Sequence, residues 1–173
     1  MDRLLSVVVS VYNEEKALEE FYRETTHVLE QISWDYELLF VNDGSRDGSQ
    51  DILDRMAASD SRVRVISFSR NFGHEAAMIA GLDYSRGDGI ICMDADLQHP
   101  PEILLEMYRL WKQGYEVVEG IKKNRGKETL FHRKSAGFFY RIMSRATGFD
   151  MENASDFKLL DRKAVESVLA MPE

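Results

Sequence analysis

Two aspartates, Asp94 and Asp96, stand one residue apart where the apolar run 89–93 ends, in the segment GIICMDADLQHPP (89–101). Carboxylates at the end of a buried strand are costly unless a positive charge lies beside them. Hard divalent cations such as Mg²⁺ or Mn²⁺ prefer oxygen ligands of this kind, and phosphate oxygens complete their coordination. The segment therefore predicts a metal-bound diphosphate. The alternative is that the two aspartates cap the helix that follows.

The elements that must position these aspartates alternate along the chain between strand and helix patterns. We expect strands at 4–12, 36–41, 63–68, 89–93 and 115–120, and helices at 15–32, 49–58, 74–85 and 102–113. Strands separated by helices of this length form right-handed βαβ units. The expected fold is a single Rossmann-like α/β domain, with a mainly parallel central sheet and helices on both faces.

Polar residues follow four of the expected strands, at 12–14, 42–45, 69–71 and 94–96. In parallel sheets, ligands bind beyond the carboxyl ends of the strands, so these residues are expected to converge on one edge. Neither the dinucleotide motif GxGxxG nor the phosphate-binding motif GxxxxGK[ST] occurs in the sequence. Carboxylates in the first turn repel phosphate but accept hydrogen bonds from a base or sugar. A nucleotide would then be held by its base and through a metal.

Charge and composition narrow the classes of partner. The net charge of −8 over 173 residues argues against nucleic-acid binding. The single cysteine, Cys92, excludes an internal disulfide and fits a reducing cytosol, where we expect it to be a core residue. Residues 122–145 carry eight Lys or Arg and one Glu. With interleaved apolar residues, the segment 122–147 suits contact with an anionic membrane surface; an ordinary core-facing helix with a basic outer face is the alternative.

Five motifs resemble the family 2 glycosyltransferases of the GT-A fold. They are VVVSVYNEE (7–15), ELLFVNDGSRDGS (37–49), SFSRNFGHEAAMIAGLDYSRGD (67–88), MDADLQHPPE (93–102) and SDFKLLDR (155–162). The resemblance is strongest to the branch that transfers a sugar from a nucleotide to a polyprenyl phosphate, such as dolichol-phosphate mannosyltransferase and bactoprenol glucosyltransferases. It implies one catalytic domain over 1–173, truncated at its C-terminal end, because the family usually continues with an arginine-containing acceptor region.

The resemblance implies a metal-dependent, inverting glycosyltransferase that uses a UDP- or GDP-linked sugar donor and a polyprenyl phosphate acceptor. The alternatives are transfer to a saccharide hydroxyl in cell-envelope polysaccharide synthesis, and a nucleotide-sugar-binding fragment without turnover. A nucleotidyltransferase fits less well, since YNEEKALEE lacks the expected Gly-rich loop. The implied location is the cytoplasm, at the inner face of the cell membrane.

The resemblance also assigns roles to the residues that could do chemistry. Asp96 would bind Mg²⁺ or Mn²⁺ and act in catalysis, with Gln98 as a second oxygen ligand. Asp94 would lie toward the ribose and base. Asp156 would face the acceptor and deprotonate a sugar hydroxyl; before an ionised lipid phosphate it would only position groups, and a capping role is the alternative. We expect His99 to be a structural hydrogen-bonder.

The remaining implied contacts are with the nucleotide. Tyr12, Glu14 and Asp43 would line the base and ribose pocket, although Tyr12 could instead pack on the first helix. Arg70, Asn71 and His74 could touch the donor sugar or its phosphates, although Arg70 could equally make a surface ion pair. Ser10 stands where the family often has proline, which we expect to affect only the stiffness of a loop.

Overall fold

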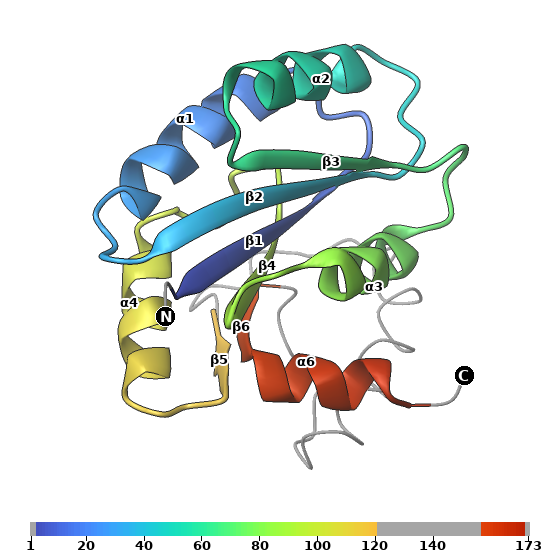
Figure 1. Cartoon of the computed structure of the whole chain (residues 1–173). Coiled ribbons are helices and arrows are strands. Elements are labelled where there is room, and N and C mark those ends of the chain that lie inside the picture. The colour runs from blue at the N-terminus through green and yellow to red at the C-terminus, as the bar shows by residue number, and fades with distance from the viewer. Residues whose placement is uncertain (1–2, 121–156, 172–173) are drawn as a thin grey trace, which may run out of the picture.

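The computed structural model describes residues 3–120 and 157–171, which form a central sheet with helices packed on it (Figure 1). The strands are β1 (Leu4–Val11), β2 (Asp35–Asn42), β3 (Val63–Ser67), β4 (Gly89–Asp94), β5 (Val117–Glu119) and β6 (Lys158–Asp161). The helices are α1 (Leu18–Leu29), α2 (Ser49–Ser59), α3 (His74–Tyr84), α4 (Ile103–Lys112) and α6 (Arg162–Leu169). None of the helices in the described ranges has the length and apolar character needed to span a membrane.

The sheet has the strand order β3-β2-β1-β4-β6-β5, with β1 to β4 parallel. This confirms the expected mainly parallel α/β sheet. Two elements are absent from those expected, β6 and α6. Strand β6 lies between β4 and β5 and is antiparallel to both. Its sequence, KLLD, is four residues long and too short to show the alternation by which a strand is recognised. The last expected strand, 115–120, is shorter than predicted and pairs with β6.

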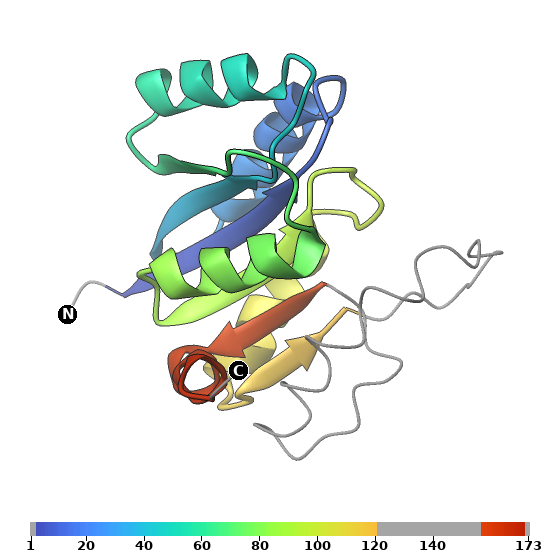
Figure 2. The ribbon, with the colours of Figure 1, turned by 90° about the vertical axis from the view of Figure 1, so that its right-hand side faces the viewer.

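Each face of the sheet carries its own hydrophobic core, as alternate residues of β1 illustrate. Val7 and Val9 belong to the core beneath α1, α2 and α4, whereas Val8 belongs to the core beneath α3 and α6. Strands covered on both faces read as continuous apolar runs, which explains the uninterrupted valines of β1. Figures 1 and 2 show helices on both sides of the sheet, so this prediction is confirmed.

The start of α1 is set by a contact that lies far away in the sequence. A helix was expected from residue 15, but α1 begins at Leu18. The N–H of Glu15 donates to Asp47 Oδ2 at 3.2 Å, and Glu15 Oε2 accepts from the Gly48 N–H at 2.7 Å. Residue 15 is therefore held by the loop before α2. The two polar turns after β1 and β2 are in this way fixed to each other.

Helix α3 packs unusually close to the sheet. At Gly81, an added Cβ would lie 2.1 Å from Cγ1 of Val8, so only glycine allows this approach. Ala77 and Met78 of α3 are buried against the same core. The close packing fixes the position of His74, the first residue of α3, relative to β1.

Candidate active site

The turn after β1 is fixed onto the loop after β2. Asn13 has a φ of 55°, a conformation that non-glycine residues adopt rarely and mostly where local bonds enforce it. Its N–H donates to Ser45 Oγ at 2.9 Å, and its Oδ1 accepts from the Arg46 N–H at 2.8 Å. The N–H of Glu14 donates to Ser49 Oγ at 2.9 Å. These bonds place Tyr12, which is 43% exposed and outside the core, at the edge of the sheet.

Three of the predicted carboxylates come together at this edge. The pKa of Glu14 is raised above its ordinary value, first by burial and then by the negative charges of Asp96 and Asp94. Asp47 adds a smaller effect of the same sign. Negative charges gathered around one carboxylate form a site that favours a cation. The expected convergence of the residues that follow β1 and β4 is therefore found.

The segment after β4 keeps its polar side chains away from the core. Ala95 is 1% exposed and packs inward, while its neighbours Asp94 and Asp96 are only half-buried. Leu97 has a φ of 56° and packs against the core, and the Gln98 N–H donates to Asp96 Oδ1 at 3.0 Å. This turn holds the backbone of Gln98 against the Asp96 carboxylate.

The alternative role of the aspartates, capping of the next helix, is wrong. Helix α4 begins at Ile103, and its N-cap residue is Glu102, whose side chain makes no capping bond. The ring of His99 packs on Phe157 with 4.8 Å between centroids, and the hydrogen bond expected of His99 stays a prediction. Cys92 is buried in the core, as predicted.

The donor set suits a hard divalent cation that also binds a ligand. Within residues 3–120 and 157–171, no three His, Cys, Asp or Glu side chains are arranged as a ready metal site. The implied coordination needs fewer protein ligands, because Asp96 and Gln98 would share the cation with diphosphate oxygens. The crowded carboxylates around Glu14 fit this reading, since they hold negative charge that a cation would neutralise.

Asp43, predicted to line the base pocket, has a structural task as well. The side chain is buried, and its Oδ1 and Oδ2 accept from the N–H groups of Phe72 and Gly73 at 2.7 and 3.0 Å. It thereby fixes the loop that leads into α3. Its neighbour Asn42 donates to Gln50 Oε1 at 2.6 Å and accepts from the Ser45 N–H at 3.0 Å. A base contact by Asp43 stays a prediction.

A pocket of about 330 Å³ opens at the carboxyl ends of β2 and β3. Arg70 and Asn71, which the sequence indicates as donor contacts, line it from the β3 side, and the loop after β2 adds Ser45 and Arg46, with Gln50 from the start of α2. The Arg70 guanidinium lies 4.6 Å from the ring centroid of Phe72, and Arg70 makes no ion pair within the described part of the chain. The exposed cation is thus available to a ligand.

Gly44 explains how the two walls of this pocket approach each other. It has a φ of 67°, and an added Cβ would lie 2.3 Å from the carbonyl carbon of Arg70. Only glycine fits a position with this φ and this contact. The glycine of the NDGS sequence therefore sets the spacing between the loop after β2 and the loop that holds Arg70.

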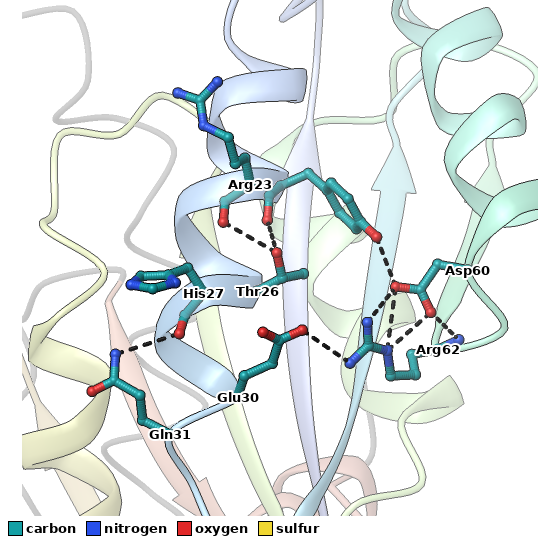
Figure 3. Close-up of polar contacts among 8 residues, drawn as sticks. Arg23, Thr26, His27, Glu30, Gln31, Asp60 and Arg62 are labelled. Atoms are coloured by element: carbon teal, nitrogen blue, oxygen red, sulfur yellow. Dashed lines mark hydrogen bonds and ion pairs between the residues drawn. The ribbon is translucent and has the colours of Figure 1, made fainter.

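A second pocket, of about 290 Å³, lies at the amino end of the sheet and is lined in part by Trp34, Tyr36 and Arg62. Part of its polar lining is paired within the protein, since Arg62 binds Asp60 and Tyr22 donates to Asp60 Oδ2 at 2.7 Å (Figure 3). The buried Tyr36 hydroxyl has no hydrogen-bond partner among the described residues. Ligands of parallel α/β sheets bind at the opposite end of the strands. We therefore place the candidate site at the carboxyl edge.

At that edge, α3 also contributes His74. Its Nδ1 lies 3.1 Å from Ser10 Oγ and 3.5 Å from Asp94 Oδ1. Ser10 is a residue of β1 and not of a loop, so the expectation that it affects only loop stiffness was wrong. Asp156 and the basic segment 122–147 lie outside the described residues.

Comparison with known proteins agrees with this arrangement. Residues 6–169 match the family described as Glycosyl transferase family 2. A Bacillus subtilis (strain 168) protein described as an uncharacterized glycosyltransferase, YkcC, is 47% identical over 169 residues, which cover 97% of this chain and 52% of that protein. The prophage bactoprenol glucosyl transferase homolog of Escherichia coli (strain K12) is 39% identical over 170 residues, which cover 98% of this chain and 56% of that protein.

Among solved structures, mannosyltransferase PcManGT from Pyrobaculum calidifontis, in complex with GDP-Man and Mn²⁺, aligns with a TM-score of 0.64 at 18% identity. The alignment covers 98% of this chain and 47% of that chain. The fold, with its polar residues at the carboxyl ends of the parallel strands, defines an α/β domain of the GT-A class, as expected. The chain belongs to glycosyl transferase family 2. It spans about half the length of the curated relatives it matches.

Proposed function

We propose that the protein transfers a sugar from a UDP- or GDP-linked donor to a polyprenyl phosphate, with inversion and with Mg²⁺ or Mn²⁺ as cofactor. The observation that carries this proposal is the convergence of Glu14, Asp94 and Asp96 at the carboxyl edge of a family 2 domain. The carboxylates of such a cluster can accept hydrogen bonds from the ribose and the base on one side, and they can bind a cation on the other.

The comparisons support the finer parts of the proposal. Relatives that share most of this chain carry the name bactoprenol glucosyl transferase, which suggests a lipid phosphate acceptor. A solved neighbour of the same fold holds GDP-Man and Mn²⁺, which suggests a nucleotide-sugar donor and a divalent metal. The basic segment 122–147 belongs to this proposal as a contact with an anionic membrane surface at the cytoplasmic side, on the strength of its charge pattern.

In this mechanism, the nucleoside is held by Tyr12, Glu14, Asp43 and Asp94. Arg70 contacts the donor phosphates or sugar. Asp96 and Gln98 would hold the cation, which when bound stabilises negative charge on the leaving diphosphate.

The acceptor oxygen attacks the anomeric carbon in line, and the bond to the diphosphate breaks as the new bond forms. A lipid phosphate oxygen is already ionised and needs no base. Asp156 would therefore position the acceptor, and it would take a proton only from a saccharide hydroxyl.

A calorimetric titration with UDP, GDP and their sugars, each with and without Mn²⁺, tests donor binding. We expect the chain to bind nucleotides of only one of the two bases, and to bind them only when Mn²⁺ is present. The variant Asp96→Ala should lose this binding. Asp83→Ala is the matched control, because Asp83 is exposed on α3, away from the cluster.

An assay of nucleoside diphosphate release then separates enzyme from binding fragment. Release that requires a polyprenyl phosphate supports the proposal, whereas release with a saccharide acceptor alone would redirect it to polysaccharide synthesis. Binding without release under any condition would contradict turnover by this chain.

A further inference from the structure

His74 lies at the carboxyl edge of the sheet and has no role in the proposed mechanism. It is the first residue of α3, and the close packing of Gly81 on Val8 fixes this helix against β1. Its Nδ1 lies 3.1 Å from Ser10 Oγ and 3.5 Å from Asp94 Oδ1. Ser10 and Asp94 are partners in the register of the parallel strands β1 and β4. One imidazole nitrogen therefore joins the ends of both strands.

The surroundings of the ring select its tautomer. An ionised carboxylate only accepts hydrogen bonds, so Nδ1 must carry a proton to interact favourably with Asp94. The other nitrogen, Nε2, is buried and has no hydrogen-bond partner among the described residues. A buried N–H without an acceptor is rarer and costlier than an acceptor without a donor. Both observations favour a proton on Nδ1 and none on Nε2.

We propose that His74 is a positioning residue: its Nδ1–H orients the Asp94 carboxylate, with Ser10 as the second anchor, so that Asp94 receives the nucleoside side of the donor. The inference rests on the proposed function for its consequence, donor binding, but its geometry concerns only this chain. Because the anchor sits on the first residue of a rigid helix, the carboxylate is presented in one orientation before the nucleotide binds.

Three variants distinguish the polar contact made by Nδ1 of His74 from the space that its side chain fills. His74→Asn keeps a side-chain N–H near the position of Nδ1, His74→Gln places one near Nε2, and His74→Ala removes both. Nucleoside diphosphate binding with Mn²⁺ is measured by calorimetry on the full chain, and thermal unfolding reports folding. We expect His74→Ala and His74→Gln to bind about tenfold more weakly, as for loss of one polar contact that orients a charged group. His74→Asn should recover most of the affinity.

Long-range ¹⁵N correlation spectra of the imidazole in the unliganded chain give an independent readout. We expect the Nδ1–H tautomer in the parent, and a change of the Nδ1 resonance in Asp94→Asn. A parent with the Nε2–H tautomer would overturn the inference, and so would equal nucleotide affinity in the three variants. If the parent binds no nucleotide, the proposed function fails, and the spectra alone still decide whether His74 holds Asp94.

Discussion

The carboxylates at the amino ends of the parallel strands (the amino edge) and those at the carboxyl ends (the carboxyl edge) lie in opposite electrostatic environments. At the amino edge, Glu37 accepts from Ser6 Oγ at 2.6 Å and from the Arg86 N–H at 2.9 Å, and it pairs with Arg64 at 2.8 Å. Burial alone would raise the pKa of Glu37, but the hydrogen bonds from Ser6 and Arg64 lower it. At the carboxyl edge, burial and the neighbouring aspartates raise the pKa of Glu14.

Asp60 at the amino edge follows the same rule as Glu37. The hydrogen bond from Arg62 outweighs the effect of burial and lowers the pKa of Asp60 to about 2, with a further contribution from Tyr22 (Figure 3). The amino edge therefore neutralises its acids within the protein, which is what a purely structural network does. At the carboxyl edge, by contrast, the charges of Asp96 and Asp94 add to the effect of burial on the pKa of Glu14, as expected of a site that binds a cation.

The largest expected effect comes from Glu37→Ala. This change removes the acceptor of Ser6 and the charge partner of Arg64 in a buried site. We expect the free energy of unfolding to fall by about 3 to 5 kcal/mol, as when one partner of a buried pair is lost. Urea denaturation measures it, with Glu14→Ala as the comparison from the other edge. An equal loss in both variants would remove the distinction between the edges.

The framework of the carboxyl edge is the next point of sensitivity. Gly44→Ala puts a Cβ 2.3 Å from the Arg70 carbonyl carbon at a φ of 67°. We expect a loss of about 1 to 3 kcal/mol in unfolding free energy, together with weaker nucleotide binding as Arg70 is displaced. Gly114→Ala has a similarly positive φ of 103° with nothing near the added Cβ, so it isolates the backbone strain. Equal nucleotide affinity in the two variants would contradict a role for the Gly44 contact in the site.

The stabilising contribution of Asp60 at the amino edge should be lost over a defined range of acid pH. The pKa of Asp60 is about 2 in the folded chain and 3.8 ordinarily. Its stabilising effect is therefore complete above pH 3.8 and is lost as the pH falls toward 2, because the unfolded chain takes up the proton first. Denaturation at pH 5, 3.5 and 2.5 should show a smaller decline in Asp60→Asn than in the parent. A parallel decline in both proteins would refute the assignment.

The smallest expected effect is an increase in the unfolding free energy, in the variant Glu14→Gln. The folded pKa of Glu14 is above 4.5, so its charge disfavours the folded state once the pH exceeds that value. We expect Glu14→Gln to raise the unfolding free energy of the metal-free chain at pH 7 by about 0.5 kcal/mol, a typical size for a change near the surface. The gain should vanish below pH 4.5. Destabilisation at pH 7 would mean that Glu14 is already balanced.

Local sequence was sufficient for the main elements and for the aspartates after β4. A buried strand followed at once by polar residues has few interpretations, and Asp94 and Asp96 lie where that pattern predicts. The features that sequence missed depend on distant partners. Helix α1 starts late because Glu15 binds the loop before α2, and Asp43 is occupied by N–H groups of the loop before α3. No local pattern encodes either contact.

We propose that the acidic carboxyl edge is a cation site completed by a nucleotide. Electron paramagnetic resonance of Mn²⁺ tests it most directly, since bound and free Mn²⁺ differ in signal. We expect the chain to bind one Mn²⁺ at pH 7 when UDP or GDP is present. Asp96→Ala should abolish this binding, and Glu37→Gln should keep it. Equal Mn²⁺ affinity in the parent and in Asp96→Ala would show that Asp96 is not a ligand of the cation.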